Sequence, residues 1–573
     1  MTIIPASFRN DVQARFLDGR AFNGPLNTTI EAFIEKAQPE ANGRIVAALV
    51  NGKLRELSLR LNQDANIVPV ATDESDGARI YRRSLSFLMI AAAAELFPNR
   101  VFTIHHSMPF GGYYCEADNG RLTAAQLDQL RTRMHELVQQ NLPITQVKVP
   151  LNEALTLFRE SGDDEKAELF AKRRKDYLTL YELNGVRDYF HGFMVPSTGY
   201  LGLFDLRQYS KGVILQFPRR HQPEVLQPFE DEARLAAVFQ AYSEWLNIIG
   251  VPRVAALNEA IKNGRMREVI LVAEAFHQQQ LSHIAAEIAQ RRPALKIVLI
   301  SGPTSAGKTT FSKRLAIQLM AKGIFPLTIS MDNYFVNRSE TPRDAHGNYD
   351  FEALEAVDVP LFREHMQKLL AGETITQPIY NFYTGEREWG DTLQIRPEHV
   401  IIIEGIHGLN PQLVAGIQPE AIYRIFISAF TQLNLDKHNR VPTTDTRLLR
   451  RIVRDAAHRG YSAADTIGRW NSVRRGEKRY IFPYQNNADI FFNSALVYEL
   501  SVLKKLAQPL LLQVEPGTPE RPEANRLIAF LQWFDPMPDE GIAGIASDSI
   551  LREFVGQSIL EDYKPGKPDQ ASR

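Results

Sequence analysis

One short stretch carries the residue types needed to bind a chain of phosphates. Residues 302–309 read GPTSAGKT and fit the pattern GxxxxGK[ST]. Glycines let backbone N–H groups turn toward phosphate oxygens, and the start of a helix adds a positive dipole. A lysine can reach the terminal phosphates, and a hydroxyl can bind Mg²⁺. The sequence therefore predicts a nucleotide site formed by Gly302, Pro303, Thr304, Ser305, Ala306, Gly307, Lys308, Thr309 and Thr310.

Two acidic residues follow apolar stretches elsewhere in the chain. Asp332 lies in SMDNYF, directly after a predicted strand, and Glu404 ends the apolar run Val400–Ile403. A carboxylate at the end of a buried strand is costly unless it is solvated, paired or bound to a cation. Asp332 could accept a proton from a hydroxyl, and Glu404 could help to hold Mg²⁺. The alternatives are an Asp in a turn and an ordinary Glu at a strand end.

An arginine-rich segment and two neutral polar segments complete the candidate site. Arg447, Arg451 and Arg454 recur at helical spacing, and Arg459 follows. Because few acids lie nearby in sequence, we expect these guanidinium groups to face either solvent or a bound anion. The segments 348–350 (NYD) and 377–382 (QPIYNF), which include Asp350 and Tyr380, suit a neutral acceptor that contains a ring.

The elements that must position these residues alternate between strand and helix. Strands are expected at Ile297–Ile300, Pro326–Ile329, Val400–Glu404 and Tyr423–Ile427, with an amphipathic helix after the glycine-rich loop. Such alternation is typical of an α/β fold with a parallel sheet, and ligands bind at the carboxyl edge of such sheets. The loop, Asp332 and Glu404 would then meet at one edge.

The first 230 residues show a different, mixed pattern. The segment from Ile45 to Leu61 reads as a hairpin, because Asn51-Gly52 is the favoured two-residue turn between strands. A short helix is expected at 29–36, a buried one at 84–96 and an amphipathic one at 124–140, with a strand–turn–strand at 105–116. Residues 232–291 read as a helical connector.

Composition limits the classes of protein that the chain can belong to. It has 573 residues, 44% hydrophobic and 23% charged, with a net charge of −1 and one cysteine, Cys115. A chain of this length predicts several domains, near-zero charge argues against a mainly nucleic-acid-binding protein, and one cysteine excludes an intramolecular disulfide. We find no apolar run that would act as a signal peptide or membrane span, and we expect a cytoplasmic protein without a membrane partner.

The stretches GPTSAGKT, DNYF, NYDF, PIYNF, IIIEG and the arginine-rich segment resemble, in order and spacing, the uridine kinase and phosphoribulokinase family over residues 295–495. The resemblance implies a P-loop kinase that uses ATP and Mg²⁺ to phosphorylate a hydroxyl. It implies Asp332 as the general base, Thr309 and Glu404 as metal ligands, and Arg454 and Arg459 on a lid. Acceptor contacts would then come from Asp350, Tyr380 and Arg451.

Residues 40–217 resemble a different family, the TGS and editing domains of threonyl-tRNA synthetase. The resemblance rests on NGK, DANIVPV and ESDGARIYRRS, and then on HHSMPFGGYYCE and YFHGFMVPSTG. The family's HxxxH pair falls on Arg83 and Phe87, and its later Cys and His fall near Thr198 and Gly202. We therefore expect neither hydrolysis nor zinc binding there, and at most weak RNA binding through the basic clusters 172–175 and 219–220.

The resulting interpretation is a five-part chain. It has a TGS-like domain (1–72), an editing-like domain (73–230), a helical connector (231–292), a P-loop kinase-like domain (293–500) and a helical extension (501–573). We expect an ATP- and Mg²⁺-dependent nucleoside kinase that transfers to a 5′-hydroxyl. Alternatives are a phosphoribulokinase-like enzyme, an RNA-responsive ATPase and a silent RNA-binding protein. The family's base-contacting histidine falls near Gly385, and altered lid positions fall near Tyr461 and Arg469, so the preferred nucleoside should differ from uridine and cytidine. An oligomer is compatible with the sequence.

Overall fold

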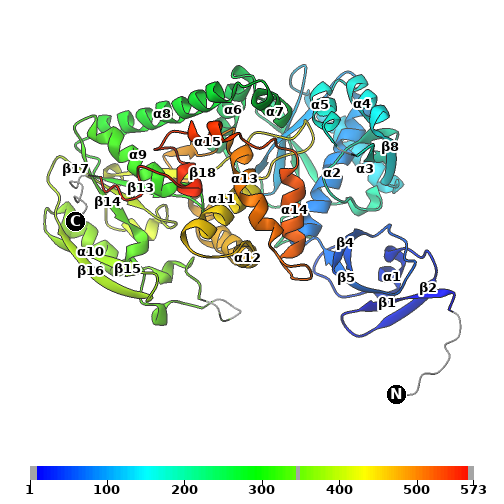
Figure 1. Cartoon of the computed structure of the whole chain (residues 1–573), viewed down its shortest axis with the longest axis horizontal. Helices are drawn as coiled ribbons and strands as arrows, with labels where there is room; N and C mark the ends of the chain where they lie inside the picture. Colours follow the sequence, from blue (N-terminus) through cyan, green and yellow to red (C-terminus); the bar gives the residue numbers. More distant parts are fainter. Residues whose placement is uncertain (1–8, 174, 344–346, 348, 566–573) are drawn as a thin grey trace. The chain divides into compact units, whose positions relative to one another are not determined.

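The computed structural model describes residues 9–173, 175–343, 347 and 349–565. Its chain divides into two compact units. The first contains Met1–Asp231 and Asn434–Arg440, and the second contains Glu232–Leu433 and Val441–Arg573 (Figure 1). The sequence-derived division into five parts stays a prediction. Among the described residues, none of the helices has both the length and the apolar character needed to cross a membrane.

The first unit begins with a small five-stranded sheet in the order β2-β1-β5-β3-β4. Helix α1 (Ile30–Ala37) buries Ile30 and Phe33 in the core of this sheet. The predicted hairpin is confirmed, since Asn51 and Gly52 have φ values of 49° and 76° between antiparallel strands. The strands are β1 (Asp11–Phe16), β2 (Ala21–Pro25), β3 (Ile45–Val50), β4 (Lys53–Glu56) and β5 (Ala65–Ala71).

The prediction that the second strand of this hairpin reaches Leu61 is wrong. Strand β4 ends at Glu56, because the next residues turn toward the start of α1. The carbonyl groups of Leu57 and Leu59 accept hydrogen bonds from the backbone N–H groups of Glu31 and Ile30. The buried helix is also longer than predicted, since α2 runs from Ser75 to Leu96 and includes the polar stretch before residue 84.

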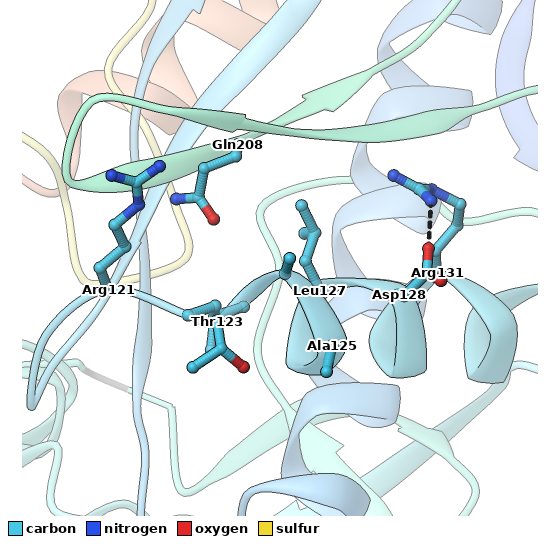
Figure 2. Close-up of a pocket in the computed structure, with 9 residues that line it drawn as sticks. Arg121, Thr123, Ala125, Leu127, Asp128, Arg131 and Gln208 are labelled. Carbon is cyan, nitrogen blue, oxygen red and sulfur yellow. Dashed lines mark hydrogen bonds and ion pairs between the residues drawn. The ribbon is translucent and has the colours of Figure 1, made fainter.

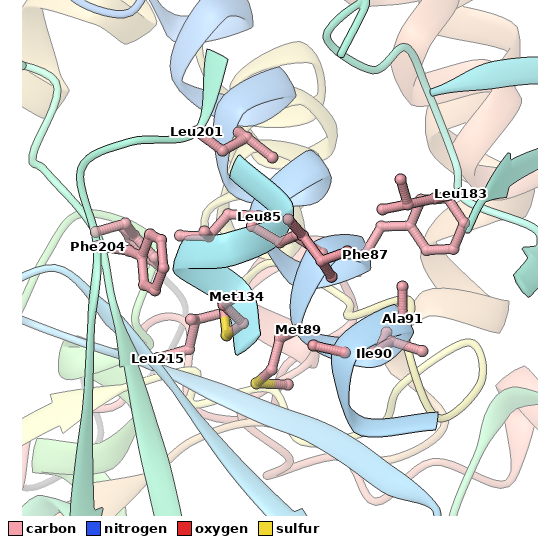
Figure 3. Close-up of a cluster of buried hydrophobic side chains, with 14 of the residues drawn as sticks. Leu85, Phe87, Met89, Ile90, Ala91, Met134, Leu183, Leu201, Phe204 and Leu215 are labelled. Carbon is pink, nitrogen blue, oxygen red and sulfur yellow. The ribbon is translucent and has the colours of Figure 1, made fainter. Parts of the chain in front are cut away.

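The rest of the first unit surrounds α2. A four-stranded sheet in the order β11-β12-β7-β6 and a three-stranded sheet in the order β10-β9-β8 contribute to a core that includes Leu85, Phe87 and Met89 of the helix (Figure 3). The predicted 105–116 hairpin and 124–140 helix are confirmed. The elements are β6 (Phe102–Met108), β7 (Gly112–Ala117), α3 (Ala124–Gln140), β8 (Thr145–Pro150), α4 (Leu151–Glu160), α5 (Asp164–Ala171), β9 (Tyr177–Leu183), β10 (Val186–Asp188), β11 (Asp205–Tyr209) and β12 (Gly212–Gln216).

Residues 434–440 join the first unit although the chain on both sides belongs to the second. The Lys437 carbonyl accepts the Ile104 N–H at 2.8 Å. Lys166 is buried, and its Nζ lies 2.5 Å from Asp188 Oδ1 and 3.5 Å from Asp436 Oδ2. Burial alone would lower the pKa of Lys166, but the surrounding carboxylates raise it above its ordinary value. Buried charges therefore hold this loop in place.

The second unit contains a five-stranded parallel sheet in the order β14-β17-β13-β18-β19. The four strands predicted for this sheet are confirmed, and the sequence analysis did not identify the fifth, β19. Their bounds are β13 (Ile297–Ser301), β14 (Phe325–Ser330), β17 (His399–Glu404), β18 (Ile422–Ser428) and β19 (Ile490–Asn493). Residues Ile297–Ile300 and Val400–Ile403 are fully buried, as expected for inner strands of a covered sheet.

Helices pack around this sheet, and a two-stranded arm extends the fold. Helix α8 contacts α9, which begins at the glycine-rich loop (Figure 1). The arm consists of β15 (Ile375–Asn381) and β16 (Glu386–Leu393). The helices are α6 (Ala233–Ile248), α7 (Val254–Lys262), α8 (Met266–Gln290), α9 (Lys308–Met320), α10 (Val359–Leu370), α11 (Thr443–His458), α12 (Ala463–Tyr480), α13 (Glu499–Leu512), α14 (Arg521–Leu531), α15 (Asp539–Ala543) and α16 (Arg552–Val555).

Candidate functional site

The parallel register brings three of the predicted stretches to one edge of the sheet. Glu404, the last residue of β17, is in register with Ile300 of β13 and with Ser330 of β14. The glycine-rich loop begins two residues after Ile300, and Asp332 follows two residues after Ser330 in a short 3₁₀ helix (Met331–Tyr334). The carboxyl ends of three neighbouring strands therefore present the loop and both carboxylates together, as the sequence predicts.

The glycine-rich loop has the backbone geometry of an anion cradle. Gly307 has a φ of 87°, and Ser305 also has a positive φ, of 57°. A Cβ on Gly302 would lie 2.0 Å from the carbonyl oxygen of Ile427, so no larger residue fits there. Lys308 begins α9, and its Nζ donates to the carbonyl oxygens of Gly302 at 2.9 Å and Pro303 at 3.2 Å. The lysine thus lies over its own loop.

Asp332 and Glu404 are two acids close enough for the charge of one carboxylate to affect the other. Burial raises the pKa of Glu404 to about 7, and the Asp332 carboxylate adds to this rise, while Lys308 opposes it. Burial likewise raises the pKa of Asp332 above its ordinary value, against the effects of Lys308 and Arg459. The Ser330 hydroxyl donates to Glu404 Oε1 at 3.1 Å. Thr309 is the exposed second residue of α9, and its hydroxyl and the two carboxylates are oxygen donors of the kind that Mg²⁺ prefers, so these residue types fit that ion.

The expectation that Arg447 faces solvent or an anion is wrong. Its side chain is buried, and its guanidinium pairs with the buried carboxylate of Glu477 on α12. Arg450 is also buried and pairs with Glu499 on α13. These acids lie 30 and 49 residues further along the chain, so a search of the neighbouring sequence could not find them. The two arginines hold helices together.

The other arginines lie closer to the loop. Arg451 donates from Nη1 to the Thr304 hydroxyl at 3.2 Å, and from Nε to Asp455 at 3.1 Å. Arg454 pairs with the same Asp455 at 2.9 Å. Arg459, just after α11, is half exposed and lies 3.7 Å from Asp455. One buried carboxylate therefore gathers three predicted guanidinium groups beside the phosphate loop.

Two acids that the sequence analysis did not identify also lie at this site. Glu477 Oε1 accepts the backbone N–H of Thr304 at 3.2 Å, in addition to its pair with Arg447. Glu352 has a buried Oε2 without a hydrogen-bond partner. Burial raises the pKa of Glu352 to about 7, and Glu477 adds to the rise, while Arg451 and Lys308 oppose it. No pattern in the neighbouring sequence predicts that Glu477 or Glu352 lies at this site.

The segments expected to contact an acceptor are partly engaged within the protein. Asp350 Oδ2 accepts from the Tyr480 hydroxyl at 3.3 Å, whereas Asn348 lies outside the described residues. Tyr380 on β15 is buried, its hydroxyl has no partner, and its ring lies 5.5 Å from that of Phe335. The aromatic rings Phe335, Tyr380 and Phe382 form a cluster at the turn end of the arm.

Comparison with known proteins finds different relatives for the N-terminal region and for the part of the chain that contains the glycine-rich loop. Residues 297–501 match the model of the Phosphoribulokinase / Uridine kinase family. The match covers less than half of the chain, and because of it we call these residues the kinase-family segment. A solved structure described as a possible uridine kinase from Bacillus stearothermophilus is 19% identical, covers 37% of this chain and 97% of its own, and aligns with a TM-score of 0.27.

The N-terminal region matches a second group of proteins. A threonine–tRNA ligase from Acidithiobacillus ferrooxidans is 37% identical over 164 residues, which is 28% of this chain and 26% of the ligase. Another, from Legionella pneumophila, is 32% identical over 186 residues, which is 32% of this chain and 29% of the ligase. The chain thus spans between a quarter and a third of the length of these relatives. The predicted resemblances to the kinase family and to threonyl-tRNA synthetase are confirmed, while the assignment of the second to TGS and editing domains stays a prediction.

In the ligase-like region, the positions aligned with the HxxxH pair are part of the packing. Phe87 is fully buried in the core, and Arg83 Nη1 donates to the Phe193 carbonyl at 2.6 Å. The Thr198 hydroxyl donates to the Leu137 carbonyl at 2.6 Å. Within the described ranges, no cluster of three or more His, Cys, Asp or Glu residues is arranged to hold a metal ion. The basic cluster 172–175 includes residue 174, which lies outside the described residues.

Three positions that the family resemblance links to base recognition, Gly385, Tyr461 and Arg469, lie against other residues of the protein. At Gly385, where the resemblance expects a histidine, a Cβ would lie 2.7 Å from the guanidinium of Arg338. Arg469 packs over the ring of Tyr461 at 4.3 Å. A histidine would therefore collide with Arg338, and the two lid residues contact each other.

The residues that line a cavity of about 810 Å³ belong to the first unit, whereas the glycine-rich loop, Asp332 and Glu404 belong to the second. The cavity is an open groove in the first unit, beside the start of α3 and the strand that carries Gln208 (Figure 2). Thr123 and Gln126 cap the N-terminus of α3 reciprocally, and Arg131 pairs with Asp128. Each of these four side chains has a partner within the protein, the Arg131 Nε through an ion pair with Asp205 at 3.2 Å, and we assign no ligand to the groove.

Proposed function

We propose that the chain is a kinase that transfers the γ-phosphoryl group of ATP to the 5′-hydroxyl of a nucleoside. The observation that supports this proposal best is the meeting of the loop 302–310, Asp332 and Glu404 at one sheet edge. Phosphoryl transfer requires mainly positioning and charge stabilisation, and this set of residues supplies both.

Each group has a distinct role in this proposal. The loop N–H groups and Lys308 bind the β- and γ-phosphates, for which Lys308 exchanges its present carbonyl partners for phosphate oxygens. Thr309 and Glu404 hold Mg²⁺, which neutralises charge on the phosphates when bound. The acceptor oxygen forms a bond to the γ-phosphorus while the bond to the ADP oxygen breaks. Asp332 receives the hydroxyl proton, and its raised pKa favours that transfer.

The three arginines around Asp455 close over the transferring group. Arg451 already contacts the loop through Thr304, whereas Arg454 and Arg459 extend from the end of the same helix. Guanidinium groups match phosphate oxygens and stabilise charge on the transition state. A shared carboxylate orients them before the nucleotide arrives, which limits the entropy lost on closing.

The arm and its aromatic cluster support a ring-containing acceptor. Tyr380 offers a hydroxyl without a partner, and Asp350 offers carboxylate oxygens for sugar hydroxyl groups. The contact between Gly385 and Arg338 supports a base preference other than uridine or cytidine. A polar site of this kind discriminates strongly against acceptors that leave its groups unpaired.

A panel of nucleosides and sugar phosphates, each incubated with ATP and Mg²⁺, tests the proposal. We expect one or more nucleosides to yield ADP and a product heavier by one phosphoryl group. Efficient and exclusive use of uridine would contradict the specificity argument but keep the kinase. Exclusive use of a sugar phosphate would contradict the nucleoside assignment.

A further inference from the structure

The last described part of the chain lies on the phosphate loop of the same unit. Residues 549–561, here called the C-terminal clasp, include the one-turn helix α16. Glu553 Oε2 accepts two hydrogen bonds from Thr310, from the hydroxyl at 2.8 Å and from the backbone N–H at 3.2 Å. The side chain of Ile550 lies 2.5 Å from the place where a Cβ of Gly307 would stand. The clasp therefore contacts both the last glycine of the loop and the first turn of α9.

The clasp is firmly attached at other points. Phe554 is fully buried beneath the guanidinium of Arg450, at 4.9 Å from its ring centre. Arg552 donates to the carbonyl groups of Ile542 and Ile545, and Lys313 donates to the carbonyl of Glu561 at 2.8 Å. None of these contacts involves the Glu553 carboxylate. The Glu553 side chain can therefore leave Thr310 while the clasp stays folded.

The Glu553 carboxylate lies at the start of helix α9, where a negative charge is favoured. The N–H groups in the first turn of a helix have no partner within the helix, and the helix dipole favours an anion there. In a nucleotide-binding loop the same N–H groups donate hydrogen bonds to the phosphate oxygens. Glu553 already supplies negative oxygen to Thr310, and it lies close enough to Glu404 to raise that residue's pKa. A phosphate at this turn would find the Thr310 N–H already hydrogen-bonded to Glu553. It would also be repelled by the negative charge of the Glu553 carboxylate.

We propose that Glu553 is an intramolecular competitor of the nucleotide, which must displace its carboxylate from Thr310 in order to bind. This inference rests on the proposed function, because it concerns the same phosphate site. It implies two arrangements of the site. In one, Glu553 satisfies the first turn of α9; in the other, a phosphate does so. A partner or substrate that draws Glu553 away would strengthen nucleotide binding without touching the nucleotide.

The test measures binding of a non-hydrolysable ATP analogue with Mg²⁺ to the full chain by calorimetry, without any acceptor. We expect Glu553→Ala to bind the analogue about tenfold more tightly than the wild type, because a charge-assisted hydrogen bond no longer competes. Glu553→Gln, which keeps the shape but loses the charge, should fall between them. Glu540→Ala, an exposed acid in the same region, is the matched control and should leave the affinity unchanged.

Thermal melting provides a second readout. Without nucleotide, Glu553→Ala should melt below the wild type, because the first turn of α9 loses its anion. The rise in melting temperature on adding the analogue should be larger than for the wild type. Unchanged or weaker binding by both Glu553 variants, while the wild type binds, overturns this inference and leaves the kinase proposal standing. Failure of every form to bind the analogue overturns both.

Discussion

The buried pair between Arg447 and Glu477 allows a quantitative prediction for the second unit. Glu477 is completely buried and accepts hydrogen bonds from Arg447, from Arg474 at 2.7 Å and from the Thr304 N–H at 3.2 Å. Glu477→Gln removes the charge and leaves the buried Arg447 guanidinium uncompensated. Breaking a buried ion pair by removing one partner typically costs about 3–5 kcal/mol. We expect the free energy of unfolding of this unit to fall by that amount.

Urea unfolding followed by tryptophan fluorescence measures this change selectively. All four tryptophans belong to the second unit: Trp245, Trp389, Trp470 and Trp533. Glu540→Gln, which removes an exposed acid, should cost less than about 0.5 kcal/mol. The double variant Arg447→Met/Glu477→Leu should recover much of the loss, because the fully buried guanidinium of Arg447 is removed together with its carboxylate, and Arg474, the other cation that loses its partner, has a side chain that is 21% exposed.

A loss below about 1 kcal/mol in Glu477→Gln would refute the assignment of this pair as a structural link. Strict additivity of the single substitutions in the double-mutant cycle would refute it as well, since contacting residues should show coupling. Either result would mean that water or another group compensates Arg447 when the carboxylate is lost.

Three further predictions concern other parts of the chain. Burial and then Arg314 lower the pKa of His277 to about 3 from an ordinary 6.5, so the unfolded chain takes up a proton first as the pH falls. Between pH 7 and pH 5 the wild type should therefore lose about 2 kcal/mol of stability that His277→Gln keeps, as measured by urea unfolding. Lys166→Met should leave Asp188 and Asp436 without their shared cation, and hydrogen exchange should show faster exchange in β6 by 100-fold or more. The full chain should contain no stoichiometric zinc by elemental analysis and should not release serine from mischarged threonine tRNA; zinc binding or deacylation above the uncatalysed rate would contradict the argument from Arg83 and Phe87.

The central part of the candidate site could be predicted because its signals are local. The glycine-rich loop, Asp332 and Glu404 each occupy a short stretch whose residue types and neighbouring strand are visible in the sequence. The parallel register then brings these stretches together without further information. The hairpin at Asn51-Gly52 could be predicted for the same reason, because its turn needs only two residues.

Features that depend on distant partners could not be predicted in this way. The acids that neutralise Arg447 and Arg450 are on other helices, and helical spacing alone led to the prediction that Arg447 faces solvent or an anion. Glu553 meets Thr310 across 243 residues of sequence. The loop 434–440 lies within the kinase-family match but packs in the first unit, which no linear division of the chain reveals. These features depend on long-range pairing of charges, which secondary structure does not determine.

The measurement that tests the central claim most directly compares Asp332→Asn with the wild type in two assays. One follows phosphoryl transfer to the acceptor found in the nucleoside panel, and the other follows binding of an ATP analogue. Because an amide has nearly the same shape but cannot take the proton, we predict transfer slower by about 10²–10⁴-fold, with nucleotide binding at least as tight as in the wild type. If Asp332→Asn keeps more than about half of the wild-type turnover, Asp332 is not the base, and the proposed arrangement of the site is wrong.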